Sequence, residues 1–384
     1  MKKFDAILVG IVGVIFVFGL IALGSASVPL AIERFQDPFY YLKHQLFFGV
    51  LPGIAAFFIF SRMDYRQWRR HPWTLAAIVL VLLAMVFIPG VGASFGHARS
   101  WVQLGPLTFQ PSEFAKLLFI MTTAGLLVRA RERGGMRRAP SRSPTGSSAG
   151  VRSGSVGDGM GRDTLIALGA FLFPTLFLLA MEPDMGGAGI FAATAVAMYF
   201  LAGGAMAHIA IFGVAGAAFF FVLAKISPYR AARFMTFLHP ELDPQGIGYH
   251  INQALLAIGS GGLLGVGLGH SRQKFQYLPE VIGDSIFAVI AEELGFLVAA
   301  GLVVLFLALI ARAIKIALDA DDFGRLVAGG IAAWFGVQIF ANIGSMIGLV
   351  PLTGITLPFV SYGGSSLVVS LAAVGVLTNI SRNT

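Results

Sequence analysis

The sequence contains no cysteine and few charged residues. Only 12% of its 384 residues are Asp, Glu, Lys or Arg, about half the charged fraction of an ordinary water-soluble domain. The absence of cysteine excludes a disulfide framework, a thiolate metal site and a thiol nucleophile. Neither a Walker A sequence nor a dinucleotide-binding fingerprint is present, so no nucleotide cofactor is expected. Metal binding through oxygen ligands stays open.

Long hydrophobic runs take the place of the missing charge. Hydrophobic residues make up 57% of the chain, and they form runs of about 20 residues, long enough to cross ~30 Å of hydrocarbon as helix. The ~10-residue alternating segments of a transmembrane β-barrel are absent. The sequence therefore predicts an all-α integral membrane protein, one polytopic domain over 1–384 with ten transmembrane helices. These cover roughly residues 6–31, 44–61, 73–92, 112–129, 163–181, 186–202, 206–226, 285–311, 325–349 and 358–380.

The positive charges predict how the helices are oriented. An even number of spans places both termini on the same side. With a cytoplasmic N-terminus, 18 of the 27 Lys and Arg residues lie on inner segments, which is the bias that the positive-inside rule uses. Both termini are therefore expected in the cytoplasm, and topology rather than nucleic-acid binding explains the net charge of +8. The first hydrophobic run is interpreted as an uncleaved span.

Two long segments interrupt the predicted helices. Residues 130–162 are rich in Gly, Ser and Arg and have almost nothing to bury, which predicts a flexible cytoplasmic linker. Residues 227–284 form a large extracytoplasmic loop between the seventh and eighth helices. The apolar stretch 251–258 inside this loop is too short to span, which predicts a short re-entrant or interfacial segment.

Carboxylates at the outer ends of the helices are the first candidates for a site. Asp284 directly precedes a predicted helix, where aspartate is a good N-cap. Glu292 and Glu293 follow ~12–13 Å deeper, and an unpaired carboxylate in lipid is costly, so both are expected to face protein or water. Glu292 is rotated only ~80° from Asp284, so we expect it to line the same cavity. For Glu293 we expect a structural partner.

Other polar residues also lie at the outer end. Glu113 and Lys116 are three residues apart on a helix, either as a local ion pair worth ~0.2–0.5 kcal/mol or as part of the site. Small residues near 363–366 are typical of helix packing, which is the alternative to a binding role there. The remaining candidates for binding substrate are Arg99, Trp101, Arg233, Lys274, Ser361 and Tyr362.

Five segments of the chain closely resemble one bacterial family. They are QPSEFAK (110–116), EPDMG (182–186), NQALLAIGSGGLLGVGLG (252–269), QYLPEVIGDSIFAVIAEELGF (276–296) and PLTGITLPFVSYGGSSL (351–367). They resemble the SEDS proteins, the shape, elongation, division and sporulation polymerases that include RodA, FtsW and SpoVE. SRQKFQYLPE and GITLPFVSYGGSS are more similar to the division branch, FtsW. The chain reads IGDSIFA (282–288) where many members read HTDFIFA, and EPDMG where QPDLG is usual.

The resemblance implies ten helices and a peptidoglycan glycosyltransferase that polymerises lipid II on the outer face of the bacterial cytoplasmic membrane, for division or elongation. It also implies a class B penicillin-binding protein as partner and makes Asp284 the essential aspartate. Asp284 would act as the base toward the acceptor sugar hydroxyl. Lys116, Arg99, Arg233, Lys274 or a Mg²⁺ or Mn²⁺ ion, with Asp284 as a candidate ligand, would stabilise the departing undecaprenyl pyrophosphate. One such step inverts the anomeric centre.

Two other function classes fit a polytopic chain with buried carboxylates. One is a lipid II flippase or transporter, and the other is a scaffold that only holds a penicillin-binding protein. A flippase needs polar groups through the whole bilayer, whereas the candidates here concentrate at the outer edge, with only Glu292 and Glu293 deeper. This distribution favours the polymerase.

Overall fold

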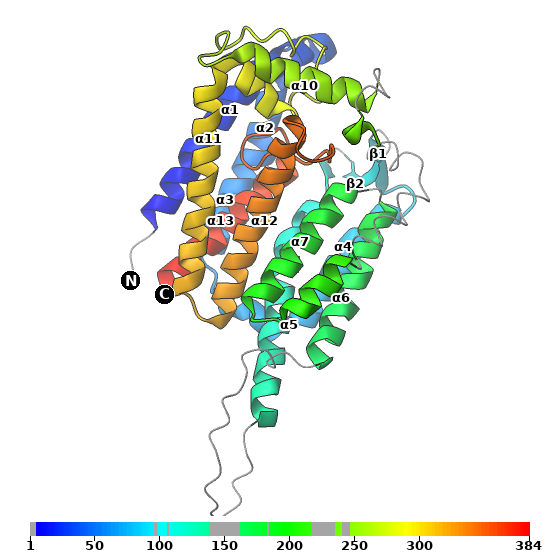
Figure 1. Cartoon of the computed structure of the whole chain (residues 1–384), viewed down its shortest axis with the longest axis vertical. Helices are drawn as coiled ribbons and strands as arrows, with labels where there is room; N and C mark the ends of the chain where they lie inside the picture. Colours follow the sequence, from blue (N-terminus) through cyan, green and yellow to red (C-terminus); the bar gives the residue numbers. More distant parts are fainter. Residues whose placement is uncertain are drawn as a thin grey trace, which may run out of the picture.

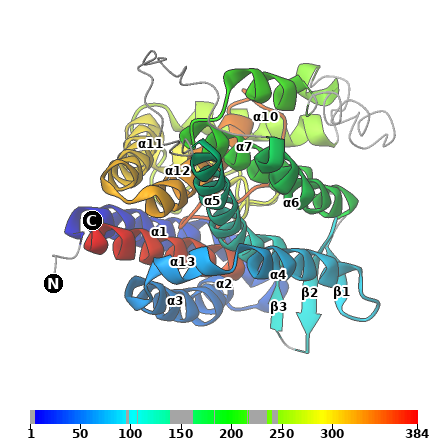
Figure 2. The same cartoon turned by 90° about the horizontal axis from the view of Figure 1, so that it is seen from below.

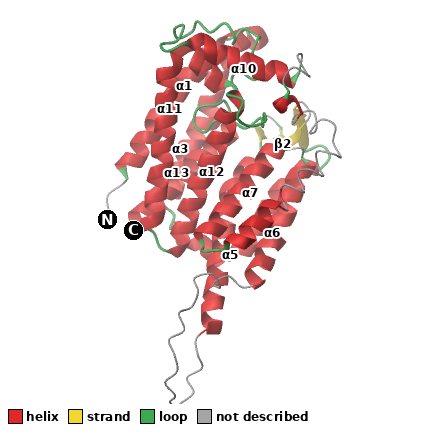
Figure 3. Cartoon of the chain, viewed as in Figure 1, coloured by secondary structure: helices red, strands yellow, loops and turns green. Residues whose placement is uncertain are grey.

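The protein is a bundle of long helices in a computed structural model (Figures 1 and 3). The structure describes residues 5–95, 98–105, 107–138, 162–182, 184–214, 216, 235–239 and 246–384. The C-terminus and the start of the first helix lie at one end of the bundle, and helix α10 and three short strands lie at the opposite end (Figure 1). We call these the terminal end and the α10 end.

Helices account for most of the predicted spans. Among the described residues, six helices are long and apolar enough to cross a membrane: α1, the continuous segment from α2 to α3, α5, α11, α12 and α13. Helices α4, α6 and α7 are apolar but shorter. Of the predicted seventh span, 206–226, the structure describes residues 206–214 and 216, so the count of ten stays a prediction. The bounds are α1 Ala6–Phe35, α2 Tyr40–Gln45, a π-helix Leu46–Val50, α3 Leu51–Arg62, a 3₁₀-helix Tyr65–Arg70, α4 Pro72–Ala84 followed by a 3₁₀-helix Met85–Phe87, α5 Pro111–Arg138, α6 Arg162–Met181, α7 Met185–Leu201, α10 Ile247–Gly261, α11 Ile286–Asp319, α12 Asp322–Met346 and α13 Gly364–Asn383.

Three helices begin at an aspartate for the same local reason. The carboxylates of Asp5, Asp184 and Asp321 accept hydrogen bonds from backbone N–H groups three residues later, at 3.0, 2.7 and 2.8 Å. Such a cap satisfies a donor that has no partner inside the helix and stabilises it by ~1 kcal/mol. The caps explain the starts of α1, α7 and α12.

Two segments differ from the prediction. Helix α5 continues to Arg138, so the first part of the predicted linker 130–162 is helical, and residues 139–161 lie outside the described residues. Part of the predicted outer loop 93–111 forms a three-stranded antiparallel sheet in the order β1-β2-β3. Its strands are β1 Gly92–Phe95, β2 Ala98–Leu104 and β3 Leu107–Phe109. Pairing of the strands satisfies the hydrogen bonds of backbone groups that lie outside the helices. The all-α prediction is therefore corrected to a helical bundle with one small sheet.

Helix α12 has a central place in the packing. It contacts α11, α7 and α5, while α13 packs along α3, an arrangement visible along the bundle axis (Figure 2). The α13–α3 contact is close because Gly375 lies against the backbone of Phe57, where an added Cβ would come 2.6 Å from the carbonyl oxygen. Small residues commonly allow such approach between membrane helices. Because α12 is surrounded, its polar side chains must find partners inside the protein.

Helix α11 is interrupted near the α10 end, and another segment fills the gap. Gly295 has φ 78° and ψ 178°, outside the helical region. The turn after α10 pairs with the backbone groups around this break: Val266 N and Gly267 N donate to the carbonyls of Glu292 and Glu293, and Phe296 N donates to Gly262 O, at 2.9–3.0 Å. The predicted re-entrant or interfacial segment is therefore helix α10 followed by a turn built into α11.

We expect Gly295→Ala to destabilise the protein strongly. A Cβ at this position would meet the Leu263 carbonyl oxygen at 2.6 Å and the Gly265 backbone nitrogen closer still, and its positive φ alone costs ~1–3 kcal/mol for a residue with a side chain. Thermal unfolding in detergent should show a clearly lower midpoint. The matched control is Gly301→Ala on the same helix, where nothing lies within 4 Å. Equal midpoints for the two variants would contradict this account.

Candidate active site

Asp284 lies in the turn that leads into α11, and its side chain is 9% exposed. The residue at the N-cap position of α11 is Ser285, so Asp284 lies one residue before the position at which it was expected. The carbonyl oxygen of Asp284 accepts a hydrogen bond from Asn342 Nδ2 at 2.8 Å. The backbone of Asp284 is thus held against α12.

The loop before α13 supports the Asp284 turn from the other side. Ser361 Oγ donates to Gly283 O at 2.6 Å and accepts from Leu357 N at 2.8 Å. The backbone N–H of Tyr362 donates to Ile282 O at 2.8 Å. The Tyr362 hydroxyl lies 2.9 Å from His44 Nδ1 on the second span. The predicted site residues Ser361 and Tyr362 therefore lie next to the aspartate turn and shape it.

Lys116 and Glu113 form a buried ion pair with Nζ and Oε1 2.7 Å apart. The Lys116 ammonium also donates to Gln338 Oε1 at 3.2 Å and lies 5.7 Å from the centre of the Trp334 ring. An exposed i,i+3 pair would have no such partners. The pair is therefore part of a buried polar cluster that joins α5 to α12.

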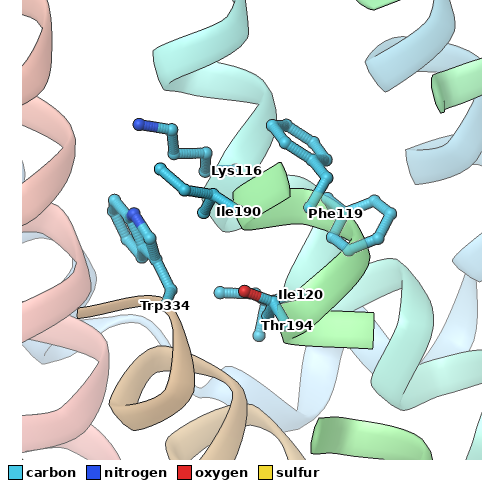
Figure 4. Close-up of a pocket in the computed structure, with 7 residues that line it drawn as sticks. Lys116, Phe119, Ile120, Ile190, Thr194 and Trp334 are labelled. Carbon is cyan, nitrogen blue, oxygen red and sulfur yellow. The ribbon is translucent and has the colours of Figure 1, made fainter. Parts of the chain in front are cut away.

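The side chains below Lys116 are closely packed. Phe119, Ile120, Ile190, Phe191, Thr194 and Trp334 surround a gap without room for a water molecule. In Figure 4 the lysine chain extends on the Trp334 side, away from Phe119. Lys116 therefore lies at the boundary between a dry apolar layer and the polar groups nearer the α10 end.

Two amides on α12 connect Lys116 to Asp284. Gln338 accepts from Lys116 and donates through Nε2 to Thr356 O at 2.9 Å. One helical turn later, ~6 Å along the axis, Asn342 donates to Ile355 O at 2.7 Å and to Asp284 O at 2.8 Å. The lysine and the aspartate thus belong to one hydrogen-bonded assembly of α5, α11, α12 and the 351–363 loop.

Three predicted residues belong to a different cluster. Lys274 pairs with Glu293 at 2.7 Å, and Ser25 Oγ donates to Glu293 at 2.6 Å. Glu292 accepts from Arg272 N at 2.9 Å and from the Ser271 hydroxyl. The expected structural partner of Glu293 is therefore present. Glu292 holds the 271–273 turn, and Lys274 is paired with the Glu293 carboxylate.

The other predicted residues are placed only in part. Trp101 lies on β2, opposite Ala93 on β1. Arg99 is on the same strand, but its side chain lies outside the described residues, and so does the whole of Arg233.

The EPDMG turn between α6 and α7 adds a buried carboxyl group. Glu182 has no exposed surface, and neither of its carboxyl oxygens has a hydrogen-bond partner among the described residues. Burial, and next the nearby Asp184, raise the pKa of Glu182 to about 8. Glu182 is therefore mostly protonated at pH 7 and contributes little negative charge to this turn.

Side chains that bind metal ions do not cluster among the described residues. No group of three or more His, Cys, Asp or Glu side chains converges in this part of the chain. Mg²⁺ usually binds through one or two carboxylates together with substrate phosphates, so Asp284 as a metal ligand stays a prediction.

Sequence reasoning missed four residues of the assembly. Gln338 and Asn342 could have been recognised from the sequence, because two amides four residues apart in an apolar helix lie on one face. No sequence pattern indicates that His250 and Ser285 meet, since a long loop separates them. Their contact, from Nε2 to Oγ, is 2.6 Å.

Comparison with known proteins gives the same family throughout. The profile of the family described as "Cell cycle protein" (FTSW_RODA_SPOVE) matches residues 5–384. Stage V sporulation protein E of Bacillus subtilis is 41% identical over 379 residues, covering 98% of this chain and 97% of that protein. The probable peptidoglycan glycosyltransferase FtsW of Trichlorobacter lovleyi is 38% identical over 382 residues, covering 99% and 94%.

Two solved structures share the fold over the whole chain. One, described under "Structural coordination of polymerization and crosslinking by a peptidoglycan synthase complex", has a TM-score of 0.76 and 29% identity, covering 99% of this chain and 98% of that one. The other, the rod shape determining protein RodA of Thermus thermophilus, has a TM-score of 0.68 and 28% identity, covering 99% and 97%. The chain therefore belongs to the SEDS family of bacterial membrane proteins, with FtsW, RodA and SpoVE.

Proposed function

We propose that this chain is a peptidoglycan glycosyltransferase that polymerises lipid II into glycan strands. The observation that carries the proposal is the assembly in which Asp284 and Lys116 are held together by Asn342 and Gln338. Transfer from a sugar pyrophosphate requires a carboxylate base and a positive charge for the leaving group, and one hydrogen-bonded assembly contains a residue for each role. The name of the FtsW relatives, probable peptidoglycan glycosyltransferase, supports the same reaction.

In the proposed reaction, Asp284 takes the proton from a hydroxyl group of the acceptor sugar. The acceptor oxygen forms a bond to the anomeric carbon of the donor, and the bond from that carbon to the pyrophosphate oxygen breaks. The electron pair leaves with undecaprenyl pyrophosphate. Because one displacement occurs at the anomeric carbon, its configuration inverts from α to β.

Lys116 would stabilise the departing pyrophosphate. Its ammonium already has Glu113 and Gln338 as partners, so the pyrophosphate would be a third acceptor for a group with three donors. A Mg²⁺ or Mn²⁺ ion would enter as a counterion of the pyrophosphate itself. No step above depends on that ion.

The proposed location is the outer face of the bacterial cytoplasmic membrane, with ten spans and both termini in the cytoplasm. The excess of Lys and Arg on the segments of the terminal end supports this orientation. The substrate's lipid tail explains why the site lies among membrane helices. A class B penicillin-binding protein is the proposed partner, in keeping with a structural neighbour described as part of a peptidoglycan synthase complex.

The rival proposal, a lipid II flippase, makes a different product, and one preparation tests both. The purified chain in liposomes should convert lipid II, supplied with divalent metal at the face opposite the termini, into glycan polymer visible on a gel. Transfer of fluorescent lipid II between leaflets is measured in the same liposomes. Scrambling without polymer from the wild type would overturn the polymerase proposal and favour the flippase.

A further inference from the structure

His250 on α10 lies over the start of α11 and contacts the residue next to Asp284. Its Nε2 is 2.6 Å from Ser285 Oγ. The same hydroxyl oxygen is 3.4 Å from Asp284 Oδ1 and 2.8 Å from Pro279 O. A continuous line of polar atoms therefore runs from the Asp284 carboxyl group through one hydroxyl to an imidazole.

A buried general base must release its proton after every transfer step. Asp284 is only 9% exposed, and the two sugars bound during turnover would cover it further. His250 is half-buried and belongs to the helix that lies across the α10 end of the bundle. The imidazole is therefore nearer to water than the carboxyl group that has to be deprotonated.

We propose that Ser285 and His250 form the exit route for the proton that Asp284 takes from the acceptor hydroxyl. The protonated Asp284 donates to Ser285 Oγ while the Ser285 hydroxyl proton moves to His250 Nε2, and the resulting imidazolium loses a proton to the outer water. One proton enters from the sugar and one leaves to solvent, and Asp284 returns to its carboxylate form. This inference rests on the proposed function.

The direction of transfer agrees with ordinary acid strengths. In water a carboxylic acid is a stronger acid than an imidazolium, so an imidazole is a suitable acceptor for the proton of a carboxylic acid. A serine hydroxyl can accept one hydrogen bond while donating another, which a relay requires. The competing account is that the His250–Ser285 hydrogen bond only fixes α10 to the start of α11.

Two variants at His250 separate these accounts. Glutamine at this position keeps a hydrogen-bonding group for Ser285 but cannot carry a proton, so we expect His250→Gln to lower kcat at least ~10-fold, with KM for lipid II unchanged. This is less than the ~10²–10⁴-fold for loss of the base itself. We expect added imidazole to restore much of the rate of His250→Ala, since a diffusible base replaces the missing ring.

The matched control is His270→Gln, because His270 is exposed on the same outer segment and its ring nitrogen Nδ1 is 3.1 Å from Leu268 O in its own turn. It should keep the wild-type rate. Ser285→Ala should lose as much rate as His250→Gln and should not respond to imidazole. If His250→Gln polymerises at the wild-type rate, or imidazole leaves His250→Ala unchanged, the relay is overturned while the polymerase stands. Absence of polymer from the wild type overturns the proposed function and the relay with it.

Discussion

Asp284→Asn should make no glycan polymer while keeping the fold of the wild type. Asparagine has the same shape as aspartate but cannot accept a proton as a base, and loss of general-base catalysis costs ~10²–10⁴-fold in rate. The backbone carbonyl of Asp284, which Asn342 binds, is unchanged by the substitution. Polymer formation from lipid II and thermal unfolding in detergent measure the two effects.

A second aspartate near the same end of the bundle serves as the control. Asp37 is paired with Lys43 at 2.8 Å on the protein surface, so Asp37→Asn should change neither the rate nor the unfolding temperature appreciably, because exposed pairs contribute little. Wild-type polymerisation by Asp284→Asn would remove the aspartate from the reaction. Loss of activity together with a collapsed unfolding transition would instead assign it a structural role.

Lys116→Met should abolish polymerisation, by ~10²–10³-fold if the ammonium stabilises the departing pyrophosphate. The substitution also leaves Glu113 buried without its partner, and breaking a buried ion pair on one side typically destabilises a protein by ~3–5 kcal/mol. Lost activity in the single variant therefore has two explanations. A further substitution is needed to separate them.

The double variant Lys116→Met/Glu113→Gln removes both charges. Replacing a buried ion pair by neutral groups is often neutral or stabilising, so this protein should unfold near the wild-type temperature yet remain inactive. Glu113→Gln alone keeps the ammonium and should retain measurable activity. Recovery of polymerisation in the double variant would reduce Lys116 to a helix ion pair.

The positions of Asp284 and Lys116 were predictable because each stands out from its surroundings. Ionisable side chains need an energetic reason to lie near lipid. Here they are an aspartate at the start of one apolar helix and a Glu–Lys pair in the first turns of another. The same logic predicted a partner for Glu293, and Lys274 supplies it. It did not predict the contact of Glu292 with the 271–273 turn, because the angular spacing on a helix states which direction a side chain takes and not which segment packs there.

Other parts of the assembly depended on packing between distant segments. The amides of Gln338 and Asn342 bind groups from three other segments of the chain. These groups are Lys116 Nζ and the backbone carbonyls of 355, 356 and 284. The break at Gly295 is stable only because the turn after α10 satisfies the freed backbone groups. Neither arrangement follows from a local pattern.

The sequence by itself determined the class of protein, most of its helices and the two ionisable groups of the proposed site. Hydropathy acts residue by residue, since each apolar side chain favours lipid or the protein interior regardless of its neighbours. Only the tertiary structure decided which polar groups meet, including Asp284 with Asn342 and His250 with Ser285. Hydrogen bonds are short and directional, so a shift of a few ångströms between two helices replaces one partner with another.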